Sequence, residues 1–169
     1  VHIGFNEPGS HRNSKTRTIT LDHLTSYDAA PSFQGIENVP RKAITMGIQT
    51  ILSAKRVLLM AWGTNKADII NKAIEGVVSS SIPTTYLQLH KNTTLILDNE
   101  AASELTRIKA PWLAANCEWD KNLRSKAISW LCRRTGKSIL KLTDKDYNDN
   151  GMSDLLALHG SSYDLNIEM

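Results

Sequence analysis

The fold is decided by the stretch Val57-Leu58-Leu59-Met60-Ala61-Trp62, which is continuously apolar, and by the turn Gly63-Thr64-Asn65 that follows it. An apolar run of this length is typical of a strand that is covered on both faces in a parallel sheet. Behind the turn, with Asn65 as N-cap, helical spacing predicts one buried face. That face consists of Ala67, Ile70, Ala73, Ile74 and Val77. We expect this crossover to be right-handed and to return the chain to the same sheet.

Further elements flank this unit. Apolar and β-branched residues predict a short strand over residues 18–21, a buried strand over 43–47 and a strand over 93–98. Helical spacing follows at residues 48–52, and a helix over 100–107 is expected to stop before Pro111. Strands that alternate with helices in this way predict an α/β protein.

The composition changes after Trp112. Residues 123–134 predict an amphipathic helix that ends at Gly136. Residues 138–142 are expected to form a strand or a docked arm, and Ser153 to cap a last short helix over 154–158. We therefore expect an α/β domain over residues 1–115 and a C-terminal extension over 116–169, a helix plus short elements packed on that domain.

Composition excludes several classes of partner. The chain has 169 residues, of which 41% are hydrophobic and 22% charged, as in an ordinary globular protein. Its 20 basic and 17 acidic residues are spread along the chain, so no nucleic-acid partner is expected. The longest apolar run is too short to span a bilayer and no secretory leader opens the chain, so no membrane partner is expected either. Cys117 and Cys132 lack metal-ligand spacing and are expected to be free thiols in a reducing cytoplasm.

The first ten residues carry a candidate acid/base pair. His2 and Glu7 lie five residues apart, with Gly4 between them and a Pro-Gly turn behind. Histidine is easily poised for proton transfer near neutral pH, and a carboxylate can hold its tautomer and stabilise its charged form. The alternative is that His2 is a stray terminal residue and Glu7 a turn residue.

The amino-acid sequence of this segment is more specific than the spacing of His2 and Glu7. Residues 2–10, His-Ile-Gly-Phe-Asn-Glu-Pro-Gly-Ser, resemble the active-site signature of the glucosamine-6-phosphate deaminase/isomerase family. The resemblance continues in the family's order through residues 14–17, 39–48, 63–67, 73–76 and 87–90, and covers about the first 110 residues. It implies a Rossmann-like three-layer αβα fold with a mostly parallel sheet. Because the chain starts inside the motif, we expect a fragment whose missing part holds a glycine-rich phosphate loop and a catalytic aspartate.

The resemblance also implies roles for individual residues. His2 would be the general acid/base that opens the sugar ring, and Glu7 would hold its imidazole. Lys66 would bind the 6-phosphate of the substrate, although a lysine at the start of a helix is otherwise most often a solvated surface residue. The reaction would convert glucosamine 6-phosphate to fructose 6-phosphate and ammonia, by aldose–ketose isomerisation and hydrolysis of an imine. No cofactor is needed, the fragment alone is expected to be inactive, and the full-length protein is expected to form a homo-oligomer.

Three positions match the activator site of allosteric family members: Ser10, Arg17 and Thr20. Ile19 departs from that pattern because a second basic residue is usual there, and the alternative for Arg17 is a structural ion pair. Residues 31–33 replace a phosphate-binding arginine, and Gln49 replaces a common glycine. These departures leave two alternatives, a 6-phosphogluconolactonase-like sugar-phosphate hydrolase and a non-catalytic sugar-phosphate-binding protein.

Other candidate motifs have plainer interpretations. Residues 146–151 match positions 1, 3, 5 and 6 of a calcium-binding EF loop, but Ala157 stands where position 12 needs a bidentate glutamate. We therefore expect a turn and no metal site. His90 and His159 are expected to be structural, and the four tryptophans to be core or interface anchors.

Overall fold

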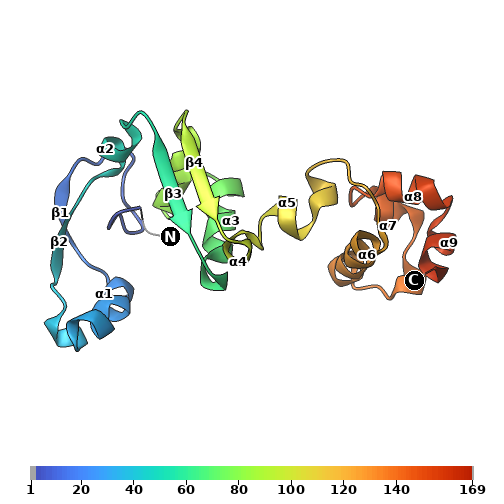
Figure 1. Ribbon diagram of the computed structural model, residues 1–169, viewed down its shortest axis with the longest axis horizontal. Coiled ribbons are helices and arrows are strands. Elements are labelled where there is room, and N and C mark those ends of the chain that lie inside the picture. Colours follow the sequence, from blue (N-terminus) through green and yellow to red (C-terminus); the bar gives the residue numbers. More distant parts are fainter. Residues whose placement is uncertain (1–2, 169) are drawn as a thin grey trace. The chain divides into compact units, whose positions relative to one another are not determined.

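The computed structural model describes residues 3–168, which form two compact units (Figure 1). The first unit runs to Glu104 and the second begins at Leu105. The assignment of residues 1–115 to a catalytic domain and of 116–169 to an extension stays a prediction.

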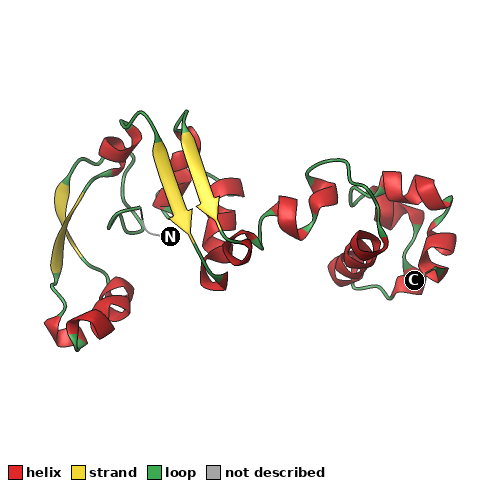
Figure 2. Ribbon diagram, viewed as in Figure 1, coloured by secondary structure: helices red, strands yellow, loops and turns green. Residues whose placement is uncertain are grey.

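The first unit contains the expected parallel strands. β3 (Val57–Ala61) pairs in parallel with β4 (Thr93–Leu97), in a register that runs from Val57 opposite Thr93 to Ala61 opposite Leu97. The chain between them forms the 3-10 helix η3 (Thr64–Lys66), α3 (Ala67–Glu75) and the 3-10 helix η4 (Pro83–Leu89), and α4 (Asn99–Ala102) follows β4. Figure 2 shows these helical segments on one face of the strand pair. The parallel pairing across a helix confirms the α/β class.

Two details around β3 differ from expectation. The strand is covered on one face only, since Leu59 and Ala61 are buried whereas Leu58 and Met60 are 54% and 58% exposed. Side chains alternate between the faces of a strand, so an apolar run does not show which faces are covered. Asn65 is also not the N-cap of α3, because η3 intervenes and Lys66 occupies that position.

A second, two-stranded sheet lies in the same unit. β1 (Arg17–Thr20) pairs antiparallel with β2 (Lys42–Thr45). Between them lie α1 (His23–Ala29) and the 3-10 helices η1 (Ala30–Phe33) and η2 (Ile36–Asn38), and α2 (Ile48–Leu52) follows β2. The expectation of a buried strand over residues 43–47 is correct for the strand but wrong for its burial. Ile44, in a two-stranded ribbon that offers little cover, is 75% exposed.

The second unit is helical. It comprises α5 (Thr106–Lys109), η5 (Pro111–Leu113), α6 (Lys121–Thr135), η6 (Ile139–Lys141), α7 (Asp144–Asn148), α8 (Ser153–His159) and α9 (Ser162–Ile167). These elements enclose one apolar core. Its fully buried members are Ala127, Leu131, Tyr147, Met152, Leu155 and Leu165. As predicted, α6 ends at Gly136, which adopts the left-handed conformation with φ of 70°.

Several expectations for this part of the chain are wrong. The helix expected over residues 100–107 is split into α4 and α5 by a turn. Of the two alternatives for residues 138–142, a strand or a docked arm, the strand is wrong, because these residues contain the 3-10 helix η6. Met152, not Ser153, is the N-cap of α8. The last helix, α9, was not expected. Its N-cap is Ser161, which accepts a hydrogen bond from the amide of Asp164 (3.2 Å).

Candidate active site

The loop that carries Glu7 is fastened to the end of β2. The amide of Phe5 donates to Thr45 Oγ1 (3.0 Å), and Nδ2 of the buried Asn6 donates to the carbonyls of Ile3 (2.7 Å) and Met46 (2.8 Å). Buried amides of this kind fix a loop because leaving their partners unpaired is costly. The conformation next to Glu7 is therefore set by β2.

Arg17 holds the same loop from the other side. Its guanidinium donates to Asn6 Oδ1 (2.9 Å) and to Ser10 Oγ (3.1 Å), so its contacts bracket Glu7 in the sequence. Both partners are neutral, which differs from the ion pair considered for Arg17. Thr20 lies at the other end of β1, exposed and opposite Lys42. The allosteric roles of Ser10, Arg17 and Thr20 stay a prediction.

A close backbone approach completes the anchoring. Ser14 accepts from the amides of Ile48 (3.0 Å, through Oγ) and Gln49 (3.0 Å, through the carbonyl). A Cβ on Gly47 would lie 2.1 Å from the carbonyl oxygen of Ser14, so only glycine fits there. Gln49, which stands where a glycine is common in the family, is an exposed residue of α2.

Glu7 is tied to α1. Its Oε1 accepts a hydrogen bond from the hydroxyl of Thr25 (2.8 Å), and the amide of the same Thr25 donates to Asp22 Oδ1 (2.7 Å). That amide is the main reason why the pKa of Asp22 lies below its usual range. Asp22 is the N-cap of α1, so one helix start places two carboxyl groups near each other.

Lys66 lies in the turn after β3, and that turn is held by Asp98, the residue directly after β4. The amide of Gly63, whose φ is +84°, donates to both carboxylate oxygens of Asp98 (3.1 and 3.0 Å). Asp98 also caps α4 by accepting from the amide of Ala101 (2.7 Å), which is the chief cause of its lowered pKa. The parallel strands thereby fix the position of Lys66, the N-cap of α3.

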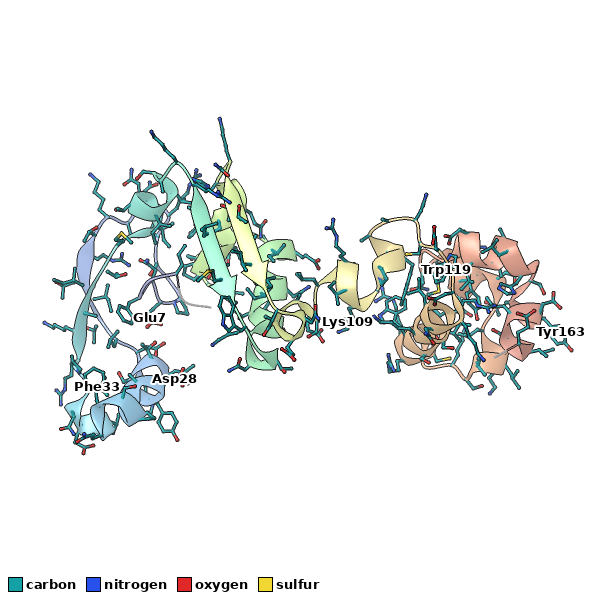
Figure 3. The ribbon with its side chains drawn as sticks, viewed as in Figure 1. Glu7, Asp28, Phe33, Lys109, Trp119 and Tyr163 are labelled. Atoms are coloured by element: carbon teal, nitrogen blue, oxygen red, sulfur yellow. The ribbon has the colours of Figure 1, made fainter. Side chains whose placement is uncertain are left out.

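Glu7 and Lys66 line one cavity of about 340 Å³. Figure 3 shows Glu7 on the opening loop and Asp28 on α1. The rest of the wall comes from the opening loop, α1, the turn before α3, α3 itself, and the segment that leads into η4 and begins it. Its polar members are Asn6, Asp22, Thr25, Asp28, Asn65, Ser81 and Thr84, and its apolar members are Pro8, Leu24, Ile69, Ile82 and Pro83. The volume falls within the range of small-molecule sites.

The other predicted site features fall as follows. His2 lies outside the described residues. Pro31, Ser32 and Phe33 form η1 and do not line the cavity. The three residues that sequence reasoning missed are Asn6, Thr25 and Asp98. Only Asp98, which stands directly before a helix, carried a recognisable signal, that of an N-cap.

His90 and His159 make hydrogen bonds or ion pairs within the fold, and part of the candidate calcium loop is helical. His90 contacts Thr93 Oγ1 (3.2 Å) and the carbonyl of Ala54 (2.8 Å), and His159 lies between Arg124 (3.0 Å) and Glu168 (3.0 Å). Asp144–Asn148 form α7 instead of an ion-binding loop. Across residues 3–168, no group of three His, Cys, Asp or Glu side chains is placed to hold a metal ion.

Aromatic and sulfur groups also have plain explanations. In the second unit Trp112 packs against Trp119 and Trp130, with ring centroids 6.1 and 5.5 Å away. Cys117 and Cys132 are free thiols, and burial raises the pKa of both. None of the helices described is long and apolar enough to cross a membrane.

Comparison with known proteins finds close sequence similarity to one group of enzymes, although no protein-family model matches the chain. It is 54% identical over 168 residues to a glucosamine-6-phosphate deaminase-like protein of Bacteroides thetaiotaomicron, covering 99% of this chain and 25% of that protein. It is 49% identical over 102 residues to glucosamine-6-phosphate deaminase 1 of Bacillus subtilis, covering 60% of this chain and 42% of that enzyme. The chain thus spans less than half the length of these relatives.

A solved structure agrees with the sequence matches. A monomeric glucosamine-6-phosphate deaminase of the NagB superfamily shares 47% identity and a TM-score of 0.58 with this chain, over 59% of this chain and 42% of the other. At this level of identity, the shared fold and the shared sequence have the same origin. The chain is therefore homologous to part of the glucosamine-6-phosphate deaminases.

Proposed function

We propose that the intact protein carrying this sequence is a glucosamine-6-phosphate deaminase, which converts glucosamine 6-phosphate to fructose 6-phosphate and ammonia. One observation carries the proposal. Glu7 and Lys66, whose family roles concern opposite parts of the substrate, line the same cavity. That arrangement lets one bound sugar phosphate meet both groups at once.

The proposed roles follow from the chemistry of each group. Lys66 binds the 6-phosphate, because Lys66 is the N-cap residue of α3 and the helix dipole favours an anion at that end of the helix. Glu7 orients the imidazole of His2, which opens the sugar ring as general acid/base. The C2 imine formed during isomerisation then loses ammonia by hydrolysis. The proposed reaction of the intact protein needs no cofactor.

The test is ammonia release from glucosamine 6-phosphate by the intact protein, with fructose 6-phosphate measured in parallel. His2→Gln should lower kcat by about 10²–10⁴-fold, as expected for loss of a general acid/base. Lys66→Met should raise KM by about tenfold or more, because a hydrogen bond to a charged group contributes about 1.5–3 kcal/mol.

Lys72→Met is the matched control for Lys66. Lys72 lies on the same helix but pairs with Asp68 on its exposed face, so its loss should leave KM unchanged. Sugar phosphate that binds in calorimetry but is not turned over would contradict the enzyme and favour a binding protein. Lactone hydrolysis without ammonia release would favour the 6-phosphogluconolactonase-like alternative.

Two further features belong to this proposal. We place the protein in the cytoplasm, where its free thiols would stay reduced. We also propose that the intact protein forms a homo-oligomer, although the solved relative is described as monomeric. Light scattering of the intact protein distinguishes a monomer from an oligomer.

A further inference from the structure

We propose that Thr25 is a positioning residue, which fixes the carboxylate of Glu7 so that this carboxylate can orient its imidazole partner. This inference rests on the proposed function and deepens it. The sequence analysis assigned no role to Thr25, which lies outside the segments that resemble the family.

The burial of α1 points to Thr25. It is the buried residue of this helix, at 8% exposed, whereas the preceding Leu24 is 68% exposed. A helix that buries a threonine and exposes the leucine beside it is not using that position for apolar packing. The threonine instead directs its hydroxyl at Glu7 Oε1.

Thr25 is itself rigidly held. Its amide donates to the N-cap Asp22 (2.7 Å), which fixes the backbone of the first turn of α1. Its β-branched side chain has few accessible rotamers in a helix. The hydroxyl therefore reaches Glu7 from a fixed point.

Glu7 needs such a fixed partner. A glutamate side chain has several rotatable bonds and loses much rotamer freedom when it is held in one geometry. A hydroxyl that donates to an ionised carboxylate makes a strong, short bond, and here it occupies one of the two oxygens (2.8 Å). A carboxylate has two oxygens, so a second donor such as the proposed imidazole can bond to the other one.

The experiment compares variants of the intact protein in the ammonia-release assay. Thr25→Val removes the hydroxyl at nearly constant volume and should lower kcat by about 10- to 100-fold, the effect of misplacing a catalytic group. KM should stay within about twofold, because Thr25 acts on orientation and not on uniform substrate binding. Thr25→Ser restores the hydroxyl and should recover most of kcat.

Two controls separate positioning from a general structural role. Ser26→Ala removes the neighbouring hydroxyl of α1, which bonds to the carbonyl of Asp22 (2.9 Å) and not to Glu7, and should leave kcat unchanged. In a Glu7→Ala background, Thr25→Val should cause no further loss of kcat, because residues that act through one another are not additive. In thermal melts, the melting temperature of the double variant should fall by less than the sum of the falls in the two single variants.

The outcomes are distinguishable. If the wild-type protein releases no ammonia, the proposed function fails, and additive melting shifts for Thr25→Val and Glu7→Ala would overturn the role of Thr25 as well. If the wild type is active, an unchanged kcat in Thr25→Val overturns this inference alone. This inference alone is also overturned if Thr25→Val raises KM without changing kcat, or if it lowers kcat as much in the Glu7→Ala background as in the wild type.

Discussion

Replacing Asn6 by alanine should loosen the loop that carries Glu7. The side chain of Asn6 donates two bonds to backbone carbonyls, at 2.7 and 2.8 Å, and accepts one from Arg17 at 2.9 Å. Two neutral bonds contribute about 1 kcal/mol each and one to a charged group about 1.5–3 kcal/mol. Arg17 is only half-buried and can bind water instead, so we expect a net loss of about 3 kcal/mol.

Hydrogen–deuterium exchange measures this loss locally, because loop opening is distinct from global unfolding. A loss of about 3 kcal/mol should speed exchange in the peptides that span residues 3–16 by roughly 100-fold. Asn13→Ala, an exposed change in the same loop, should alter it little. Equal exchange rates in the Asn6 and Asn13 variants would refute the view that Asn6 anchors the loop.

Three further predictions concern backbone fit and charge. Gly47→Ala should destabilise the first unit more than Gly9→Ala in urea denaturation, since its Cβ would meet the backbone of Ser14, whereas the Cβ of Gly9 meets open space and only the φ of +90° opposes it. The pKa of Asp146 is lowered from 3.8 to about 2, chiefly by a hydrogen bond from Lys137. Its contribution to stability is therefore full above about pH 4 and is lost as pH falls towards 2. In Asp146→Asn, the melting temperature should depend less on pH between about 4 and 2. Asp98→Ala should free the Gly63 amide and raise KM with little change in kcat, and an unchanged KM would show that the turn holds itself.

The elements of this chain could be predicted where local periodicity decides them. The apolar run at 57–62 and the helical spacing behind it locate β3 and α3 within a few residues. Their burial could not be predicted. An apolar residue such as Met60 can be buried, but the sequence does not show whether another element packs on that face of the strand. The missed α9 has a similar cause, since its six residues are too few to show a helical period.

The site divides in the same way, between residues that react and residues that hold them. Glu7 and Lys66 were predictable through resemblance, because charged groups in a family signature are recognisable one by one. Asn6 and Thr25 carry no such signal, since Asn and Thr are ordinary in turns and first helical turns, and only the folded chain shows where their hydrogen bonds go. Both side chains are nevertheless more deeply buried than the carboxylate they position. Most buried polar side chains are hydrogen-bonded, so the burial of Asn6 and Thr25 together with their bonds around Glu7 identifies the two positioning residues that sequence reasoning missed.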